Sequence, residues 1–259
     1  MSGFAAALRC EWRKVRRSTA LSLVAAGALF TPAIITVARL VHSQQLPALY
    51  AASDFWLLLW KNAWESMAVF FLPLAAILVT SLVAQIEFRN NAWKQVHTLP
   101  LSRSALFFAK FTIVLALMAL FFVLFNAAVY LSALIPWLAV RGLPYPTATL
   151  PVQAFLGENV LYFVDCLPIV AAQYLLSLHF RNFLVPIGIG FLAWVGALAA
   201  LSWKFGYLLP YTYTMLNYLK DSTSRHAPVP PDFHVLALAY FAAFIAAGYA
   251  LFLARRQKG

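Results

Sequence analysis

The chain has 259 residues, of which 63% are hydrophobic and only 10% are charged. A soluble domain is typically about half apolar and about a quarter charged, so this composition excludes a disordered protein, a fibre and an ordinary soluble enzyme. The net charge of +11 at pH 7 would suggest nucleic acid binding in a soluble protein, but a membrane protein carries such an excess on its cytoplasmic side. We therefore expect an all-α integral membrane protein that binds no nucleic acid.

The first 19 residues combine an apolar helical face with a cluster of cations. One face, spaced for a helix, carries Phe4, Leu8, Trp12 and Val15, and five Lys or Arg residues lie beside it. This pattern is typical of a helix in the membrane interface, with its cations directed at lipid phosphates. We expect residues 1–19 to form this helix, with Trp12, Arg13 and Arg16 as anchors. The alternative is a positive flank that only fixes the topology.

Six stretches are apolar over the roughly 20 residues that a membrane-spanning helix needs. They are residues 20–38, 66–86, 105–135, 159–179, 183–203 and 235–254. The first stretch has a longer basic lead and a longer apolar run than a cleaved signal peptide, so we expect it to be retained. Residues 20–259 are thus predicted to form one six-helix transmembrane domain.

The distribution of cations between these stretches predicts the orientation of the chain. Of the 19 Lys and Arg residues, 13 lie before the first stretch, in the second and fourth loops, and after the last stretch. Positive charge accumulates on the cytoplasmic side of membrane proteins. Both termini are therefore predicted to be cytoplasmic, which agrees with an even number of spans.

Three tryptophans precede the second stretch at intervals of four residues. A helix would place Trp56, Trp60 and Trp64 along one side, and Trp is favoured at the level of the lipid headgroups. We expect a short external helix that these indoles anchor in the interface. An aromatic site for cargo is the alternative.

The second cytoplasmic loop, residues 87–104, carries an unusual mixture of Trp, amides and cations. Trp93, Val96 and Leu99 would form a small apolar face on a short helix, which Pro100 would end. Ser102 is well placed to cap the helix that follows. We expect this loop to dock a soluble partner, although a lipid-facing turn would show a similar pattern.

Two segments resemble ABC-2-type transporter permeases. In the first, an acidic residue ends the second stretch and is followed by Leu99-Pro100-Leu101-Ser102-Arg103 and by Lys110. The second, Gln173 to Gly190, resembles the branch associated with lantibiotic immunity and bacitracin-type export. The resemblance implies that residues 87–104 dock on a separate ATP-binding subunit in two copies, and that two permeases pair as a homodimer or heterodimer.

That resemblance assigns coupling to the ATPase to five residues, which are Glu87, Trp93, Pro100, Arg103 and Lys110. The chain has no Gly-Lys-Ser/Thr phosphate loop, so ATP and Mg²⁺ are expected on the partner chain. It shows neither a metal-ligand spacing nor a catalytic set. We thus expect no metal, no cofactor and no enzymatic activity of its own.

Polar residues inside the predicted spans are candidates for a substrate pathway. Asp165 lies about two turns into the fourth stretch, where an ionised carboxylate must face the bundle or a wet cavity. No His or Lys at a matching depth is apparent in the sequence, so a single carboxylate gives little support for a proton relay. Asn126 and Gln173 line the same pathway or hydrogen-bond one helix to another.

We therefore expect a permease subunit of an ATP-driven exporter in the bacterial plasma membrane. By resemblance, its cargo is an amphiphilic peptide or a peptide antibiotic, exported or expelled as self-protection. The alternative is a non-transporting immunity or scaffold protein that sequesters a toxin.

Overall fold

The computed structural model describes residues 3–89, 102–180, 182–220 and 232–254, without the side chains of residues 87–89. This part of the chain is helical and contains no strand. Its main helices are α1 (Gly3–Val15), α2 (Thr19–Val41), α3 (Leu46–Tyr50), α4 (Phe55–Ser66), α5 (Leu72–Arg89), α7 (Arg103–Ala139), α8 (Val152–His179), α9 (Leu184–Ala200), α10 (Tyr213–Leu219) and α11 (Phe233–Ala254). Shorter pieces are the 3-10 turns η1 (Ser43–Gln45), η3 (Gly206–Leu208) and η4 (Pro210–Thr212), and the π-helix η2 (Met67–Phe71).

Five helical runs are long and apolar enough to cross a membrane within these described ranges. They are α2, the run through α4, η2 and α5, and then α7, α8 and α11. The protein is thus a multi-pass membrane protein. The predicted stretch 183–203 forms only the 17-residue helix α9, which is shorter than a typical span. Six spans and the cytoplasmic position of both termini remain predictions.

The second predicted span is longer than the sequence pattern indicated. Residues 55–86 are one apolar helical run of 32 residues, because α4 continues through η2 into α5. A π-turn inserts one extra residue into the helical ladder and often occurs at functional sites. The external helix and the span that follows it are therefore a single element.

Local signals fix where two of the long helices begin. Ser18 accepts a hydrogen bond from the amide of Ala20 at the start of α2, and Ser102 accepts one from the amide of Ala105 at the start of α7. Both side chains satisfy amides that have no partner within the helix. The cap predicted at Ser102 is confirmed.

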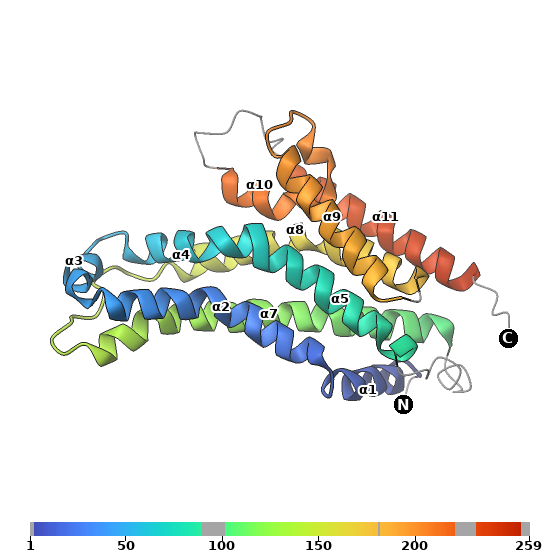
Figure 1. Cartoon of the computed structure of the whole chain (residues 1–259), viewed down its shortest axis with the longest axis horizontal. Coiled ribbons are helices and arrows are strands. Elements are labelled where there is room, and N and C mark those ends of the chain that lie inside the picture. Colours follow the sequence, from blue (N-terminus) through green and yellow to red (C-terminus); the bar gives the residue numbers. More distant parts are fainter. Residues whose placement is uncertain (1–2, 90–101, 181, 221–231, 255–259) are drawn as a thin grey trace.

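The long helices pack side by side around α8. This helix contacts α5, α11 and α10, while α2 packs along α7. As Figure 1 shows, α1, the end of α5, the beginning of α7 and the end of α11 lie at one end of the molecule, and α3 lies at the other. We call the end that holds α1 the inner end.

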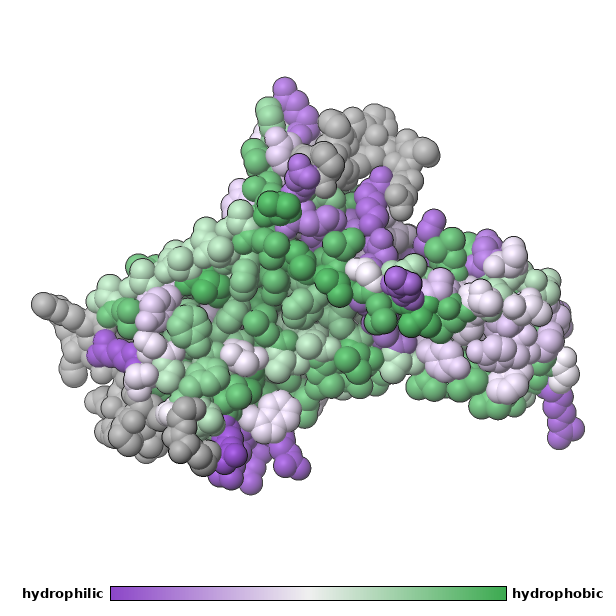
Figure 2. All heavy atoms as spheres, turned by 180° about the vertical axis from the view of Figure 1, so that it is seen from behind, coloured by the Kyte–Doolittle hydropathy of each residue, from purple (hydrophilic) through white to green (hydrophobic). Residues whose placement is uncertain are grey.

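The outer surface of the bundle is apolar. In Figure 2, hydrophobic residues cover the middle of the visible face and hydrophilic residues gather toward its periphery. Only 11% of the most apolar window of α11 is buried inside the protein, and Leu192 of α9 is 70% exposed. Such a surface is stable in lipid, where apolar exposure has no cost.

Candidate functional sites at the inner end and within the bundle

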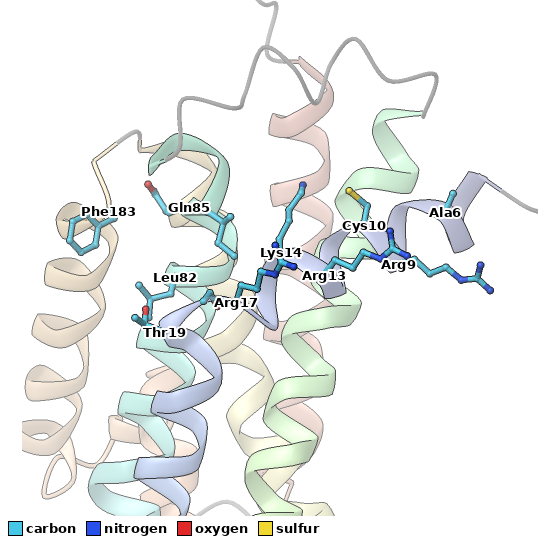
Figure 3. Close-up of a pocket in the computed structure, with 12 residues that line it drawn as sticks. Ala6, Arg9, Cys10, Arg13, Lys14, Arg17, Thr19, Leu82, Gln85 and Phe183 are labelled. Atoms are coloured by element: carbon cyan, nitrogen blue, oxygen red, sulfur yellow. The ribbon is translucent and has the colours of Figure 1, made fainter.

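A basic cavity lies at the inner end, between α1 and the last turns of α5. Its volume is about 890 Å³, and its cationic lining consists of Arg9, Arg13, Lys14 and Arg17. No carboxylate occurs among the described residues that line it. Figure 3 shows Arg9, Arg13 and Lys14 on α1, and Arg17 in the turn that follows it, beside Leu82 and Gln85 of α5, with Phe183 on the far side. The concentration of positive charge suits an anionic group, either on a lipid or on a protein partner.

An ion-pair network holds α1 against α7. Glu11 is only 1% exposed, and its carboxylate lies 2.9 Å from Lys110 Nζ and 2.6 Å from Lys14 Nζ. Lys110 lies two turns into α7 and is itself 4% exposed. A buried charge is tolerated only when it is paired, so Glu11 and Lys110 depend on each other. Lys110, which the family resemblance assigns to coupling, is thus a contact between α1 and α7.

The face that α1 turns to the bundle differs from the predicted one. Ala7, Glu11 and Val15 are its buried residues, so Val15 packs inside instead of facing lipid. Phe4 and Trp12 are 40% and 42% exposed. Arg13 and Arg16 are also exposed. An outward surface with two aromatic side chains beside cations fits the interfacial helix predicted for residues 1–19, which begins at Gly3 and ends at Val15.

The predicted coupling loop is described only at its two ends. Glu87 lies in the last turn of α5, and Arg103 is the exposed first residue of α7. Trp93 and Pro100 lie outside the described residues. The ends of α5 and α7 meet the inner end beside α1 (Figure 1), so residues 87–104 connect two spans there. Docking of an ATPase on this segment remains a prediction.

The three tryptophans of α4 face the protein, not the lipid headgroups. Trp56, Trp60 and Trp64 are 4%, 7% and 1% exposed. Trp60 stacks on Phe155 with ring centroids 4.1 Å apart, and Trp64 stacks on Tyr162 at 3.8 Å. The spacing correctly placed the indoles on one side, but that side packs inside the bundle and leaves little indole surface for the interfacial anchoring that the sequence predicts. Trp60 and Trp64 thus find aromatic partners on α8, and Trp56 stacks on Tyr130 of α7.

Asn126 and Gln173, two residues of the predicted substrate pathway, hold helices together. The Asn126 amide of α7 donates to Asn159 Oδ1 of α8 at 2.8 Å, and Asn159 donates back at 3.0 Å. Gln173 of α8 donates to Ser81 Oγ at 2.8 Å and to the Pro186 carbonyl at 2.6 Å. Such bonds between spans stabilise a bundle in lipid.

Tyr211 supplies a further partner for Gln173. Its hydroxyl donates to Gln173 Oε1 at 3.4 Å. Burial raises the pKa of Tyr211 above its usual range, because the phenolate would lose its hydration. The hydroxyl therefore stays protonated and able to donate, which leaves every polar atom of the Gln173 amide with a partner.

Asp165 has a partner that the sequence did not reveal. Its Oδ1 lies 2.7 Å from His234 Nδ1, at the start of α11, and the carboxylate is fully buried. The expectation that no His lies at a matching depth is thus wrong, since 69 residues separate the pair in sequence. Its second oxygen, Oδ2, is buried without a hydrogen-bond partner among the described residues. No three metal-ligating side chains come together in the described ranges.

Comparison with known proteins identifies the family. A sequence model described as "ABC-2 family transporter protein" matches residues 7–197, which covers most of the chain from α1 to α9. Comparison with characterised proteins finds no match. The matched range includes both segments on which the resemblance to ABC-2-type permeases rests, whereas nothing singles out the lantibiotic and bacitracin branch.

Proposed function

Because the chain belongs to the ABC-2 family of transporter proteins, we propose that it is the permease of a bacterial plasma-membrane exporter for an amphiphilic peptide or peptide antibiotic. Members of this family are membrane transport subunits without catalytic activity of their own, and they associate with an ATP-binding subunit. Two ATPase copies and a paired second permease, identical or different, would complete the complex. Expulsion of the peptide would protect the producing cell.

The match over residues 7–197 supports the assignment to an ABC-2 permease, and the arrangement at the inner end supports coupling to a partner. The ends of α5 and α7, which frame residues 87–104, lie beside the basic cavity of α1. A docked ATPase would push on Glu87 and Arg103 through that loop. Since Lys110 ties α7 to Glu11 of α1, a tilt of α7 would carry α1 with it and change access between the paired permeases.

Substitutions in the loop test the coupling. We expect Trp93→Ala and Arg103→Ala to reduce co-purification of the ATP-binding subunit and to lower peptide-stimulated ATP hydrolysis by about tenfold, the effect of losing roughly 1.4 kcal/mol of contact. Trp203→Ala and Arg141→Ala are matched controls, because both side chains are exposed and lie beyond the far ends of α9 and α7. These controls should retain full stimulation.

Two results would contradict the proposal. Unchanged co-purification and unchanged stimulation in both loop variants would remove the coupling role of residues 87–104. Protection from a peptide in cells that express the chain without an ATP-binding subunit would instead indicate a scaffold that sequesters the peptide.

A further inference from the structure

Three arginines bring accessible positive charge to the basic cavity at the inner end. Arg9, Arg13 and Arg17 line this cavity and are exposed. Arg13 and Arg17 form no ion pair with a carboxylate within the described part of the chain. The carboxylate of Glu11, on the same helix, is buried against Lys110 at 2.9 Å and does not reach these two arginines. The cavity therefore presents positive charge to an occupant that enters from outside.

The other side of the cavity is apolar and also accessible. Leu82 and Ile86 of α5 are half-buried, and Phe183, which precedes α9, is 42% exposed. In Figure 3, Leu82 and Phe183 lie on one side of the cavity, and Arg9 and Arg13 lie on the other. A soluble anion would leave the apolar side in contact with water. A phospholipid suits both sides, because its acyl chains are attached close to its phosphate.

The beginning of α2 sets the depth of the cavity in the membrane. Ser18 and Thr19, at the N-terminus of α2, line it. The 23 residues of α2 rise about 35 Å, which is close to the roughly 30 Å of the hydrocarbon core. This N-terminus therefore lies at the level of the lipid headgroups. The partial positive charge at the N-terminus of a helix adds to the attraction for a phosphate there.

We propose that this cavity binds the headgroup of one anionic phospholipid from the adjoining leaflet. The guanidinium groups of Arg13 and Arg17 would donate to the phosphate oxygens, a pairing that the planar guanidinium favours. The first part of the acyl chains would pack on Leu82 and Phe183. The lipid would thus connect α1 with α5 across the cavity. This site concerns a resident lipid and not the cargo, so it goes beyond the proposed function and does not depend on it.

Native mass spectrometry of the full chain in a neutral detergent tests this site, because it resolves each bound lipid. We expect one tightly bound dioleoylphosphatidylglycerol per chain, with saturable binding. Arg13→Gln and Arg17→Gln should each weaken this binding about tenfold, which corresponds to about 1.4 kcal/mol. Arg16→Gln is the matched control, because Arg16 is exposed beside both residues but does not line the cavity. It should bind the lipid as the wild type does.

Two other probes identify the chemistry that the cavity recognises. Dioleoylphosphatidylcholine has the same acyl chains and a phosphate but no net charge, so it should bind at least about tenfold more weakly, a difference of about 1.4 kcal/mol. Inorganic phosphate has no acyl chains and at millimolar concentration should not displace phosphatidylglycerol. Equal affinity for the two lipids would overturn the proposal. Displacement by inorganic phosphate would overturn it as well and would indicate a site for a soluble anion.

The labelling rate of Cys10 locates the bound lipid. Cys10 lines the cavity and is half-buried, whereas Cys166 is fully buried, so a thiol reagent reaches Cys10 first. Phosphatidylglycerol that fills the wild-type site should slow this labelling several-fold. Arg13→Gln should need about tenfold more lipid for the same effect. A labelling rate that does not change with bound lipid would place the lipid elsewhere and would contradict the proposal.

A charge-retaining variant separates binding from folding. Arg13→Lys keeps the positive charge but loses the planar guanidinium, so it should recover part of the affinity that Arg13→Gln loses. Both variants change an exposed side chain and should unfold at the wild-type temperature. Equal loss of binding in Arg16→Gln and Arg13→Gln would show a diffuse attraction to the interface and would overturn the proposal. Absence of saturable binding would do so too and would favour an acidic protein surface as the occupant.

These measurements need no nucleotide, no ATP-binding subunit and no peptide. A failure of the coupling experiment therefore leaves the lipid result intact, and a failure of lipid binding leaves co-purification with the ATPase intact. The two proposals can thus fail independently.

Discussion

Replacement of Lys110 by Met is expected to release α1 from the bundle. Glu11 is 1% exposed, and its ion pair with Lys110 at 2.9 Å is almost fully buried. Removal of one member of a buried pair costs about 3–5 kcal/mol, because the other charge is left uncompensated. Lys14 still reaches Glu11 at 2.6 Å with its side chain 22% exposed, so we expect the low end, about 3 kcal/mol.

Native-state hydrogen exchange of the α1 amides measures this loss directly, since local opening sets the exchange rate. A cost of about 3 kcal/mol corresponds to roughly 100-fold faster exchange over Gly3–Val15, with α8 unaffected. Exchange in α1 that accelerates less than about threefold, which corresponds to about 0.7 kcal/mol, would refute the view that this pair holds α1 to α7.

Two further variants distinguish charge burial from simple contact loss. Lys14→Met removes the more exposed partner, and partly exposed pairs contribute about 1 kcal/mol or less, so exchange should rise no more than about fivefold. The double variant Glu11→Leu with Lys110→Met removes both buried charges and leaves Lys14, whose side chain is 22% exposed, as the remaining cation of this network. It should exchange nearly as slowly as the wild type, because well-packed apolar residues often replace a buried ion pair without loss.

Three other substitutions test the contacts between spans. A Cβ on Gly190 would lie 2.5 Å from Gln173 Oε1, so Gly190→Ala should cost about 1–3 kcal/mol through overpacking and lower the unfolding temperature in detergent. Asn126→Leu leaves Asn159 Oδ1 without its donor, while the Asn159 NH2 still donates to the Phe155 carbonyl; it should cost about 1–3 kcal/mol, and the double leucine variant should recover part of this loss. Gln85 donates to the carbonyl of Ser177 on α8 and to that of Phe180, the residue that follows this helix. We therefore expect Gln85→Leu to lower peptide-stimulated ATP hydrolysis several-fold with basal hydrolysis unchanged, and equal stimulation would contradict this role.

The long helices could be predicted from the sequence because a run of 20 apolar residues has few alternatives. The continuity of α4 with α5 could not, since Lys61, Asn62 and Glu65 interrupt the apolar run before residue 66. In the structure these three residues lie on the exposed side of the helix, so they do not end it. Hydropathy averaged along a sequence does not separate the two faces of one helix.

The tryptophans of α4 show a second limit. A period of four residues establishes that Trp60 and Trp64 share a face, but a lipid headgroup layer and an aromatic core both favour that face. The choice depends on Phe155 and Tyr162 of α8, about 95 residues further along the chain. The pairing of Asp165 with His234 depends in the same way on the packing of α11 against α8.

The position of α8 connects these observations. At the inner end, α8 is tied to α5 by Gln85 and by the bond from Gln173 to Ser81, and α5 leads directly into residues 87–104. Farther along, the same helix carries Tyr162 and Asp165 beside α10. A displacement of α5 would therefore move α8, because hydrogen bonds join the two helices at the inner end. Farther along, α8 carries Asp165, whose Oδ2 has no hydrogen-bond partner among the described residues. The same part of α8 holds the buried pair of Asp165 and His234, so a displacement of α5 would also reach the contact between α8 and α11.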